Sequence, residues 1–277
     1  MSHAISVIIR TFNSAATLPQ VLAKLNPAPD DEIIVVDSGS MDATLEIAAR
    51  AGARILPADL PFNYSTSLNL GFRSARNPWV LVLSSHCVPL EAGYLPGWRK
   101  AVASFPADVA VAYGATLLST SDLRKRLAEG TTFLDKARWE QHPAHGGNGN
   151  ALYRRESWLQ REFDASLPTA EDLEWMLWAL RSGFRIANVP DRAVLYRNAS
   201  SLRNMYRKGF LEARMAGELM GTPAMPGRHL AIAIGSLIKR VLLFRIGWPD
   251  FFKQGAHRFG AFWGSRAVSK KPPRPAS

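Results

Sequence analysis

Cysteine is almost absent from this sequence, which has a single one, Cys87, in 277 residues. One thiol excludes an internal disulfide framework and a zinc site built from several thiolates, and it fits a reducing compartment. The first residues, Met1 to Thr11, also lack a basic segment followed by a signal-type apolar core. We therefore expect no secretory export and a cytoplasmic location.

Long uninterrupted apolar runs are missing as well. The nearest approach to one lies between His229 and Trp248, where Leu230–Ile238 gives nine residues before Lys239 and Arg240. Each charge at the centre of a membrane-spanning helix would cost about 2.5 to 3.5 kcal/mol. This segment is therefore predicted to form an amphipathic helix lying on the inner face of the cell membrane rather than a span.

Acidic residues are scarce in the C-terminal part of the chain. Residues 197–277 hold 15 Lys and Arg against 3 Asp and Glu, whereas residues 1–196 hold 19 against 20, so the net charge of +11 comes from the end of the chain. Such a basic block suits an anionic membrane surface or nucleic acid. Its Leu, Ile, Phe and Trp residues favour a membrane, so we expect no nucleic-acid partner. The alternative is that these helices pack on the rest of the chain or on a second copy, as a homodimer.

Apolar runs of strand length alternate with helical patterns in the first half of the chain. Ile5–Ile9, Ile33–Val36 and Trp79–Leu83 are typical of strands covered on both faces of a sheet. The alternation predicts an α/β fold with a mixed, mainly parallel sheet flanked by helices. We expect this domain to occupy residues 1–220 and a basic helical appendage to occupy residues 221–277.

Polar residues follow two of these strands, at the edge where ligands bind in open α/β sheets. Asp37 follows one of them and is succeeded by Ser38, Gly39 and Ser40, while Ser84–Pro89 follows another. Ser40 is predicted to cap the next helix. Asp37 thus lies where a nucleotide would be held, although the same residues also suit a simple turn.

A second acidic pair precedes a helix with an apolar stripe. With Thr169 as the helix cap, Asp172 falls in the first turn, where the helix dipole favours a carboxylate. Asp172 then either only stabilises the amino terminus of the helix, or acts as a general base directed into the site. The stripe consists of Leu173, Met176, Leu177 and Leu180.

The segment between these two regions is polar. Residues 119–145 show weak periodicity and are predicted to contain one helix and a mobile lid. The glycines of residues 146–149 permit close approach of the backbone to a ligand, or they form an ordinary loop before the next strand. His142 and His145 lack acidic companions at ligand spacing, so we interpret them as loop or acceptor-site residues.

Taken in order, these segments resemble the inverting glycosyltransferases of family 2, which have the GT-A fold. The resemblance covers about residues 4–220 and implies a Rossmann-like, mainly parallel sheet. It rests on Ser6–Asn13, Ile34–Asp42, Asn69–Gly71, the strand before Ser84–Pro89, Gly146–Arg155, and Glu171 and Asp172 with Trp175.

The resemblance implies a binding site for a nucleotide-sugar donor. Thr11, Asn13 and Asp37 are implied to hold the base and ribose of the nucleotide. The other donor contacts implied by the matched motifs are Ser38, Asn69 and Ser85.

The resemblance also implies the chemistry. Asp172, with Glu171 beside it, would deprotonate a hydroxyl of a glycan or lipid-linked acceptor, and that hydroxyl would attack the anomeric carbon. One displacement inverts the configuration, so the paired carboxylates of a hydrolase are not needed.

Two departures from the family pattern concern the metal. Many members have an Asp-x-Asp type motif that binds a divalent cation, but this chain has Ser84-Ser85-His86. His86 can ligate Mn²⁺ without adding negative charge, so we expect Mn²⁺ or Mg²⁺ to bind weakly or to be dispensable. Arg197 stands where many relatives have a His, and we expect it to stabilise the departing diphosphate.

The sequence also suits two rival functions. One is a catalytically silent GT-A-like nucleotide-binding or scaffold protein at the membrane. The other is a nucleotidyltransferase, but such an enzyme normally has a glycine-rich basic loop after the first strand, and Arg10–Asn13 has no glycine.

Overall fold

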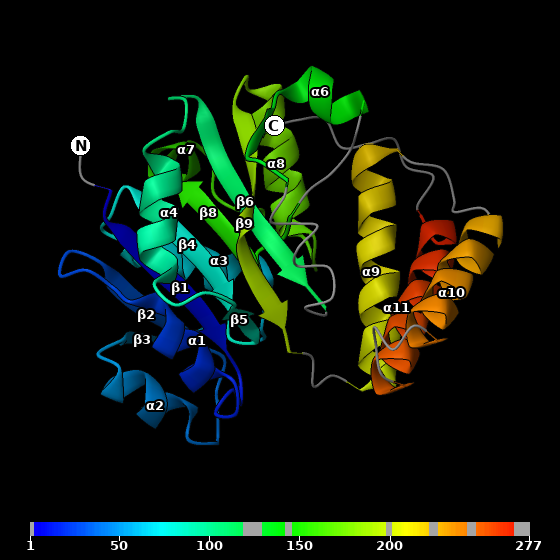
Figure 1. Ribbon diagram of the computed structural model, residues 1–277, viewed down its shortest axis with the longest axis horizontal. Coiled ribbons are helices and arrows are strands. Elements are labelled where there is room, and N and C mark those ends of the chain that lie inside the picture. Colours follow the sequence, from blue (N-terminus) through cyan, green and yellow to red (C-terminus); the bar gives the residue numbers. More distant parts are fainter. Residues whose placement is uncertain are drawn as a thin grey trace. The chain divides into compact units, whose positions relative to one another are not determined.

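A nine-stranded mixed sheet forms the centre of the N-terminal part of the computed structural model (Figure 1). The structure describes residues 3–118, 129–141, 146–197, 201–221, 227–242 and 248–268. Contacts divide the chain into two compact units, Met1–Arg197 and Asn198–Ser277, and each is described by itself. The sequence predicts this division at residue 220, whereas the helix of residues 202–220 packs against the last helix of the chain and so falls in the second unit.

The sheet has the order β3-β2-β1-β4-β8-β6-β9-β5, and β7 pairs with β9. Neighbouring strands from β3 to β4 are parallel, whereas β8 lies antiparallel between β4 and β6. The expected mainly parallel first half is confirmed. The strands are β1 (Ile5–Thr11), β2 (Glu32–Asp37), β3 (Arg54–Pro57), β4 (Trp79–Ser84), β5 (Cys87–Pro89), β6 (Val109–Leu117), β7 (Thr132–Leu134), β8 (Asn150–Arg154) and β9 (Arg185–Tyr196).

Helices cover this sheet. They are α1 (Leu18–Leu25), α2 (Thr44–Arg50), α3 (Tyr64–Ser74), α4 (Tyr94–Val102), α6 (Lys136–Gln141), α7 (Arg155–Gln160) and α8 (Glu171–Arg181). In the segment predicted to hold a helix and a lid, β7 and α6 are described. His142, His145 and most of the remainder of that segment lie outside the described residues.

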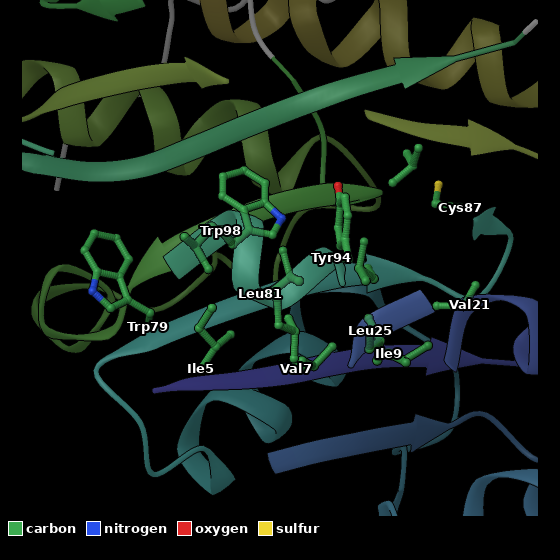
Figure 2. Close-up of a cluster of buried hydrophobic side chains, with 14 of the residues drawn as sticks. Ile5, Val7, Ile9, Val21, Leu25, Trp79, Leu81, Cys87, Tyr94 and Trp98 are labelled. Atoms are coloured by element: carbon green, nitrogen blue, oxygen red, sulfur yellow. The ribbon is translucent and has the colours of Figure 1, made fainter. Parts of the chain in front are cut away.

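One face of the sheet packs against α1 and α4. Figure 2 shows alternate residues of β1, Ile5, Val7 and Ile9, together with Tyr94 and Trp98 of α4. All five side chains are buried, as expected for a mostly apolar strand that is covered by a helix layer. This layer fixes β1, and with it the residues at its carboxyl end.

The opposite face packs against α3. Gly71 of α3 lies so close to the sheet that a Cβ there would stand 2.9 Å from the Ile8 side chain. Phe72 of the same helix stacks on Trp158 and meets the ring of Tyr153 edge to face, with centroid distances of 4.9 and 5.4 Å. Arg10, two residues after Ile8 on β1, therefore lies on this aromatic face.

Two predicted helix caps are wrong. Ser40 does not cap the helix after β2, which begins at Thr44. The Ser40 hydroxyl instead donates a hydrogen bond to the Asp37 carboxylate. The helix with the acidic pair begins at Glu171 after Ala170, whose φ of 64° is left-handed, so Thr169 makes no cap. Asp172 is accordingly the second residue of α8.

The C-terminal unit consists, in its described part, of α9 (Leu202–Met220), α10 (Gly227–Leu242) and α11 (Trp248–Arg266). Ser201 caps α9 by accepting from the amide of Asn204. Within the described residues, no helix is both apolar and long enough to cross a bilayer. Residues 222–226 and 243–247, which connect these helices, and the chain end after Val268 lie outside the described residues.

Glycines set the contact between α9 and α11. A Cβ on Gly260 would lie 2.0 Å from the Tyr206 carbonyl oxygen, and one on Gly264 would lie 2.0 Å from that of Phe210. The residue numbers of the contacting positions rise together, from 206 and 260 to 210 and 264, so α9 and α11 run parallel. The two backbones therefore touch directly, at a distance that only glycine permits.

Gly260→Ala should separate these helices and lower the free energy of unfolding by about 1 to 3 kcal/mol, because the new methyl group meets backbone atoms that cannot move aside. Thermal unfolding followed by circular dichroism would measure the change. Gly255→Ala is the matched control, since nothing lies within 4 Å of its Cβ position. Equal midpoints for the two variants would contradict the close contact.

Candidate active site

The carboxyl ends of β1, β2 and β4 meet at one edge of the sheet. Thr11 pairs with Asp37 across β1 and β2, and Arg10 pairs with Ser84 across β1 and β4. The amide of Ser84 then donates to the carbonyl of Gly149, 3.2 Å away, just before β8. Segments far apart in sequence thus form one continuous edge.

Asp37 organises the first part of this edge. Its buried carboxylate accepts hydrogen bonds from the Thr11 hydroxyl (2.7 Å), from the amide of Gly39 (2.9 Å) and from Ser40 through both its amide (2.8 Å) and its hydroxyl. Burial alone raises the pKa of Asp37, but these four donors outweigh it and hold the pKa below its ordinary value. The carboxylate is therefore ionised, and it fixes the turn that contains Ser38.

Asn13 ties the loop after β1 to the loop after β2. Its backbone has a left-handed φ of 47°, its side-chain oxygen accepts from the Met41 amide at 2.9 Å, and its amide donates to the Ser40 hydroxyl at 2.8 Å. The Ser38 amide donates to the Thr11 carbonyl at 3.0 Å. Four residues predicted to contact the donor, Thr11, Asn13, Asp37 and Ser38, are thus brought together.

The acidic pair of α8 lies at the other part of the edge. Asp172 accepts from the Asn148 amide at 3.0 Å through one oxygen and from the Leu173 amide at 2.8 Å through the other. Glu171 is buried and accepts from the Asn148 side chain at 3.1 Å. Burial, and then the charge of Asp172, raise the pKa of Glu171 to about 7, while Arg10 acts in the opposite direction.

Arg10 connects the two parts of the edge. Its Nη1 atom lies 3.9 Å from Glu171 Oε1, and its guanidinium carbon lies 4.9 Å from the centre of the Tyr64 ring. Nη1 is buried and has no hydrogen-bond partner among the described residues. The strand pattern alone does not single out Arg10 as a site residue, although it is the one charged residue of β1.

Asn69 is expected to contact the donor, but both polar atoms of its side chain bind the backbone of Phe163 instead. It is buried, its side-chain nitrogen donates to the Phe163 carbonyl at 2.9 Å, and its oxygen accepts from the Phe163 amide at 3.0 Å. Ser65 and Asn63 of the same region donate to carbonyls of residues 164–167. Asn69 therefore holds the segment that leads into α8.

Ser85, His86 and Arg197 lie where β4 leads into β5. Ser85 is buried and shares a 2.8 Å hydrogen bond with the Ser14 hydroxyl. The Arg197 amide donates to the His86 carbonyl at 2.7 Å, and the His86 ring meets Tyr196 edge to face at 4.7 Å. The structure therefore brings the backbones of His86 and Arg197 together.

The donor atoms at the end of β4 do not fit a resident divalent metal. They are the hydroxyls of Ser84 and Ser85 and the imidazole of His86, and the Ser85 hydroxyl is already bonded to Ser14. Mn²⁺ and Mg²⁺ prefer carboxylate ligands. Across the part of the chain that the structure describes, no group of three or more His, Cys, Asp or Glu is placed to hold a metal.

The sequence matches known glycosyltransferases over part of its length. It is 34% identical to an uncharacterized glycosyltransferase of Mycobacterium tuberculosis over 93 residues, which is 34% of this chain and 41% of that one. It is 32% identical to a PGL/p-HBAD biosynthesis glycosyltransferase of Mycobacterium bovis over 131 residues, 43% of this chain and 49% of that one. The chain therefore spans less than half the length of these curated relatives.

The fold is similar to that of solved glycosyltransferases. The mannosyltransferase PcManGT from Pyrobaculum calidifontis, in complex with GDP-Man and Mn²⁺, has a TM-score of 0.63 at 16% identity, over 95% of this chain and 86% of that chain. Glucosyl-3-phosphoglycerate synthase from Mycobacterium tuberculosis, in complex with phosphoglyceric acid, has a TM-score of 0.59 at 19% identity, over 77% of each chain. Because the sequence identities are below 20%, these similarities show a shared fold and nothing further.

The family is shown by the sequence itself. The model described as "Glycosyl transferase family 2" matches residues 6–159, which is more than half of the chain. This range includes the Asp37 turn, the end of β4 and the Asn148 loop. The chain belongs to glycosyl transferase family 2 and has its GT-A fold.

Proposed function

We propose that the N-terminal unit transfers a sugar from a nucleotide-diphosphate donor to a hydroxyl of a glycan or lipid-linked acceptor, with inversion at the anomeric carbon. The observation that carries this proposal is the position of Asp172. Its carboxylate is held by the Asn148 amide at the same sheet edge as the Asp37 turn, 135 residues earlier in the chain. A family 2 chain with a fixed carboxylate there suits base-assisted transfer.

In the proposed reaction Asp172 acts as the general base. The acceptor hydroxyl gives its proton to a carboxylate oxygen of Asp172, and the acceptor oxygen forms a bond to the anomeric carbon. The bond from that carbon to the diphosphate oxygen breaks, and the diphosphate leaves with the electron pair. The amino terminus of α8 favours negative charge at Asp172.

Other residues would bind the donor and the leaving group. The turn of Thr11, Asn13, Asp37 and Ser38 would hold the nucleoside, since this edge is where α/β sheets bind nucleotides. Arg197 would bind the diphosphate through two parallel hydrogen bonds. Its positive charge would replace part or all of the positive charge that a metal supplies. Structural relatives hold Mn²⁺ with UDP-glucose or GDP-mannose, whereas Ser84-Ser85-His86 favours weak or dispensable metal binding here.

Asp172→Asn should lower turnover about 10²- to 10⁴-fold while leaving donor binding unchanged, because it removes a proton acceptor and keeps the shape. Release of nucleoside diphosphate from UDP-glucose or GDP-mannose would measure turnover, and calorimetry would measure binding. Glu174→Gln is the matched control on the same helix, since Glu174 pairs with Arg161. A native protein that binds donors without any turnover would instead support the silent nucleotide-binding scaffold.

Turnover should persist in excess chelator and rise only modestly when Mn²⁺ or Mg²⁺ is added, because the end of β4 offers no carboxylate ligand. The same nucleotide-release assay would compare the three conditions. Arg197→Gln should then lower the turnover that persists in chelator. Complete loss of turnover in chelator, restored by Mn²⁺, would contradict a dispensable metal.

We propose further that the C-terminal unit binds the anionic inner face of the cell membrane. Phe252, Phe259 and Trp263 are spaced seven and four residues apart on α11, so they form one stripe, and they are 54%, 47% and 52% exposed. Residues 198–277 contain 14 Lys and Arg against 3 Asp and Glu. An exposed aromatic stripe on a strongly basic unit suits anionic headgroups.

Sedimentation with vesicles tests this contact. The protein should sediment with vesicles of phosphatidylglycerol and much less with phosphatidylcholine, and added salt should release it because the attraction is partly electrostatic. Phe259→Ser with Trp263→Ser should weaken binding, whereas Leu159→Ser, at a 58% exposed position in the other unit, should not. Failure to sediment, together with a dimer in solution, would assign the stripe to a second copy of the chain.

A further inference from the structure

Asn148 lies in the turn before β8 and is almost completely buried, with 3% of its surface exposed. The local sequence assigns no separate role to Asn148, because an asparagine among glycines is also typical of an ordinary turn. Its backbone amide and both polar atoms of its side chain nevertheless contact the acidic pair or one tyrosine. We infer that Asn148 is a positioning residue for the general base, and that the Tyr153 hydroxyl holds Asn148 in place.

Asn148 contacts both carboxylates through different groups. Its backbone amide donates to Asp172 Oδ2 at 3.0 Å, and its side-chain nitrogen donates to Glu171 Oε1 at 3.1 Å. Glu171 and Asp172 are neighbours in sequence, so one residue fixes the orientation of two adjacent side chains. Loss of the side-chain contact alone would free Glu171 and disturb the base beside it.

Gly147 permits this close approach. A Cβ at residue 147 would stand only 3.1 Å from Asp172 Oδ2, which is tighter than nearly all real contacts of that kind. The Asn150 amide also donates to the Gly147 carbonyl at 3.0 Å, so the turn is closed before the strand begins. The loop is therefore shaped to present the Asn148 amide to Asp172.

Tyr153 fixes the side chain of Asn148. Its hydroxyl donates to the Asn148 side-chain oxygen at 2.7 Å, which leaves the amide nitrogen to face Glu171. Burial raises the pKa of Tyr153 well above its ordinary value, so the hydroxyl keeps its proton and remains a donor. The tyrosine ring itself is held edge to face by Phe72, Phe163 and Trp175, with centroid distances of 5.4, 5.6 and 5.2 Å.

Charge supplies a reason for this arrangement. Glu171 is buried between Asp172, which repels its anion, and Arg10, which attracts it from 3.9 Å without a hydrogen bond. A buried carboxyl in such a balance has no single preferred orientation unless a donor fixes it. The side-chain amide of Asn148 is that donor, and it keeps the Glu171 carboxylate from turning toward Asp172.

The inference rests on the proposed function, in which Asp172 is the base. Asn148 touches no reacting atom in this scheme, so its effect must pass through Asp172. Asn148→Ala and Tyr153→Phe should therefore each lower kcat about tenfold or more, because small displacements of a catalytic group have large effects. The KM for the donor and the donor affinity should change little.

A comparison in the Asp172→Asn background separates positioning from general structural damage. If Asn148 and Tyr153 act through Asp172, adding either substitution to Asp172→Asn should lower kcat no further. The probe is nucleoside diphosphate released from UDP-glucose or GDP-mannose, whichever raises the melting temperature of the native protein. Calorimetric donor binding is measured on every variant.

Tyr94→Phe is the matched control. The Tyr94 hydroxyl is also buried and also donates to an asparagine of the same turn, Asn150 (2.7 Å), but this contact lies on the face covered by α1 and α4. Removal of this hydroxyl, which also lies 3.0 Å from the Arg192 carbonyl, should lower the melting temperature about as much as Tyr153→Phe does, because each variant removes one buried hydroxyl, and it should leave kcat unchanged. The melting temperatures of Tyr94→Phe and Tyr153→Phe show whether the two variants lose the same stability.

The outcomes distinguish the two hypotheses. If Asp172→Asn keeps native turnover, the proposed function fails. If Asp172→Asn loses turnover while Tyr153→Phe keeps native kcat, the inference fails and the proposed function stands. The inference also fails if Tyr94→Phe lowers kcat as much as Tyr153→Phe, or if Tyr153→Phe lowers the residual rate of Asp172→Asn by the same factor as in the native protein.

Discussion

Burial of the Glu171 carboxyl at the start of α8 is the constraint on which the site depends. A buried carboxyl is costly unless it is paired and hydrogen-bonded, and here the pairing comes from distant segments. Arg10 reaches it from β1, and Asn148 reaches it from the turn before β8. The same contacts bring the neighbouring Asp172 to the carboxyl edge of the sheet, so one electrostatic requirement links three elements.

Much of the fold could be predicted from the sequence because several strands are made almost entirely of apolar residues. Ile5–Ile9 and Trp79–Leu83 are strands in the structure, and Asp37 ends a third at the expected edge. Such runs are local and have a simple physical meaning, since only a strand buried on both faces needs them. The order of elements then follows from the short connections of α/β folds.

The contacts that organise the site could not be predicted in this way. Asn148 meets Asp172 across 24 residues, and Asn69 meets Phe163 across 94. No periodicity encodes such pairs, because they depend on where loops return to the sheet. The same limit explains the wrong caps, since Ser40 could bond either to the next helix or to Asp37, and only the folded turn decides between them.

The glycine contact between α9 and α11 has a consequence for the environment of the C-terminal unit. Gly260 and Gly264 bring one helix backbone against another, so part of the seam is direct backbone contact, beside buried apolar side chains such as Met205 and Met215. Contacts of this kind keep their strength where water is scarce. For the proposed contact with lipid headgroups, this means that the part of the seam held by backbone contact does not need bulk water around it.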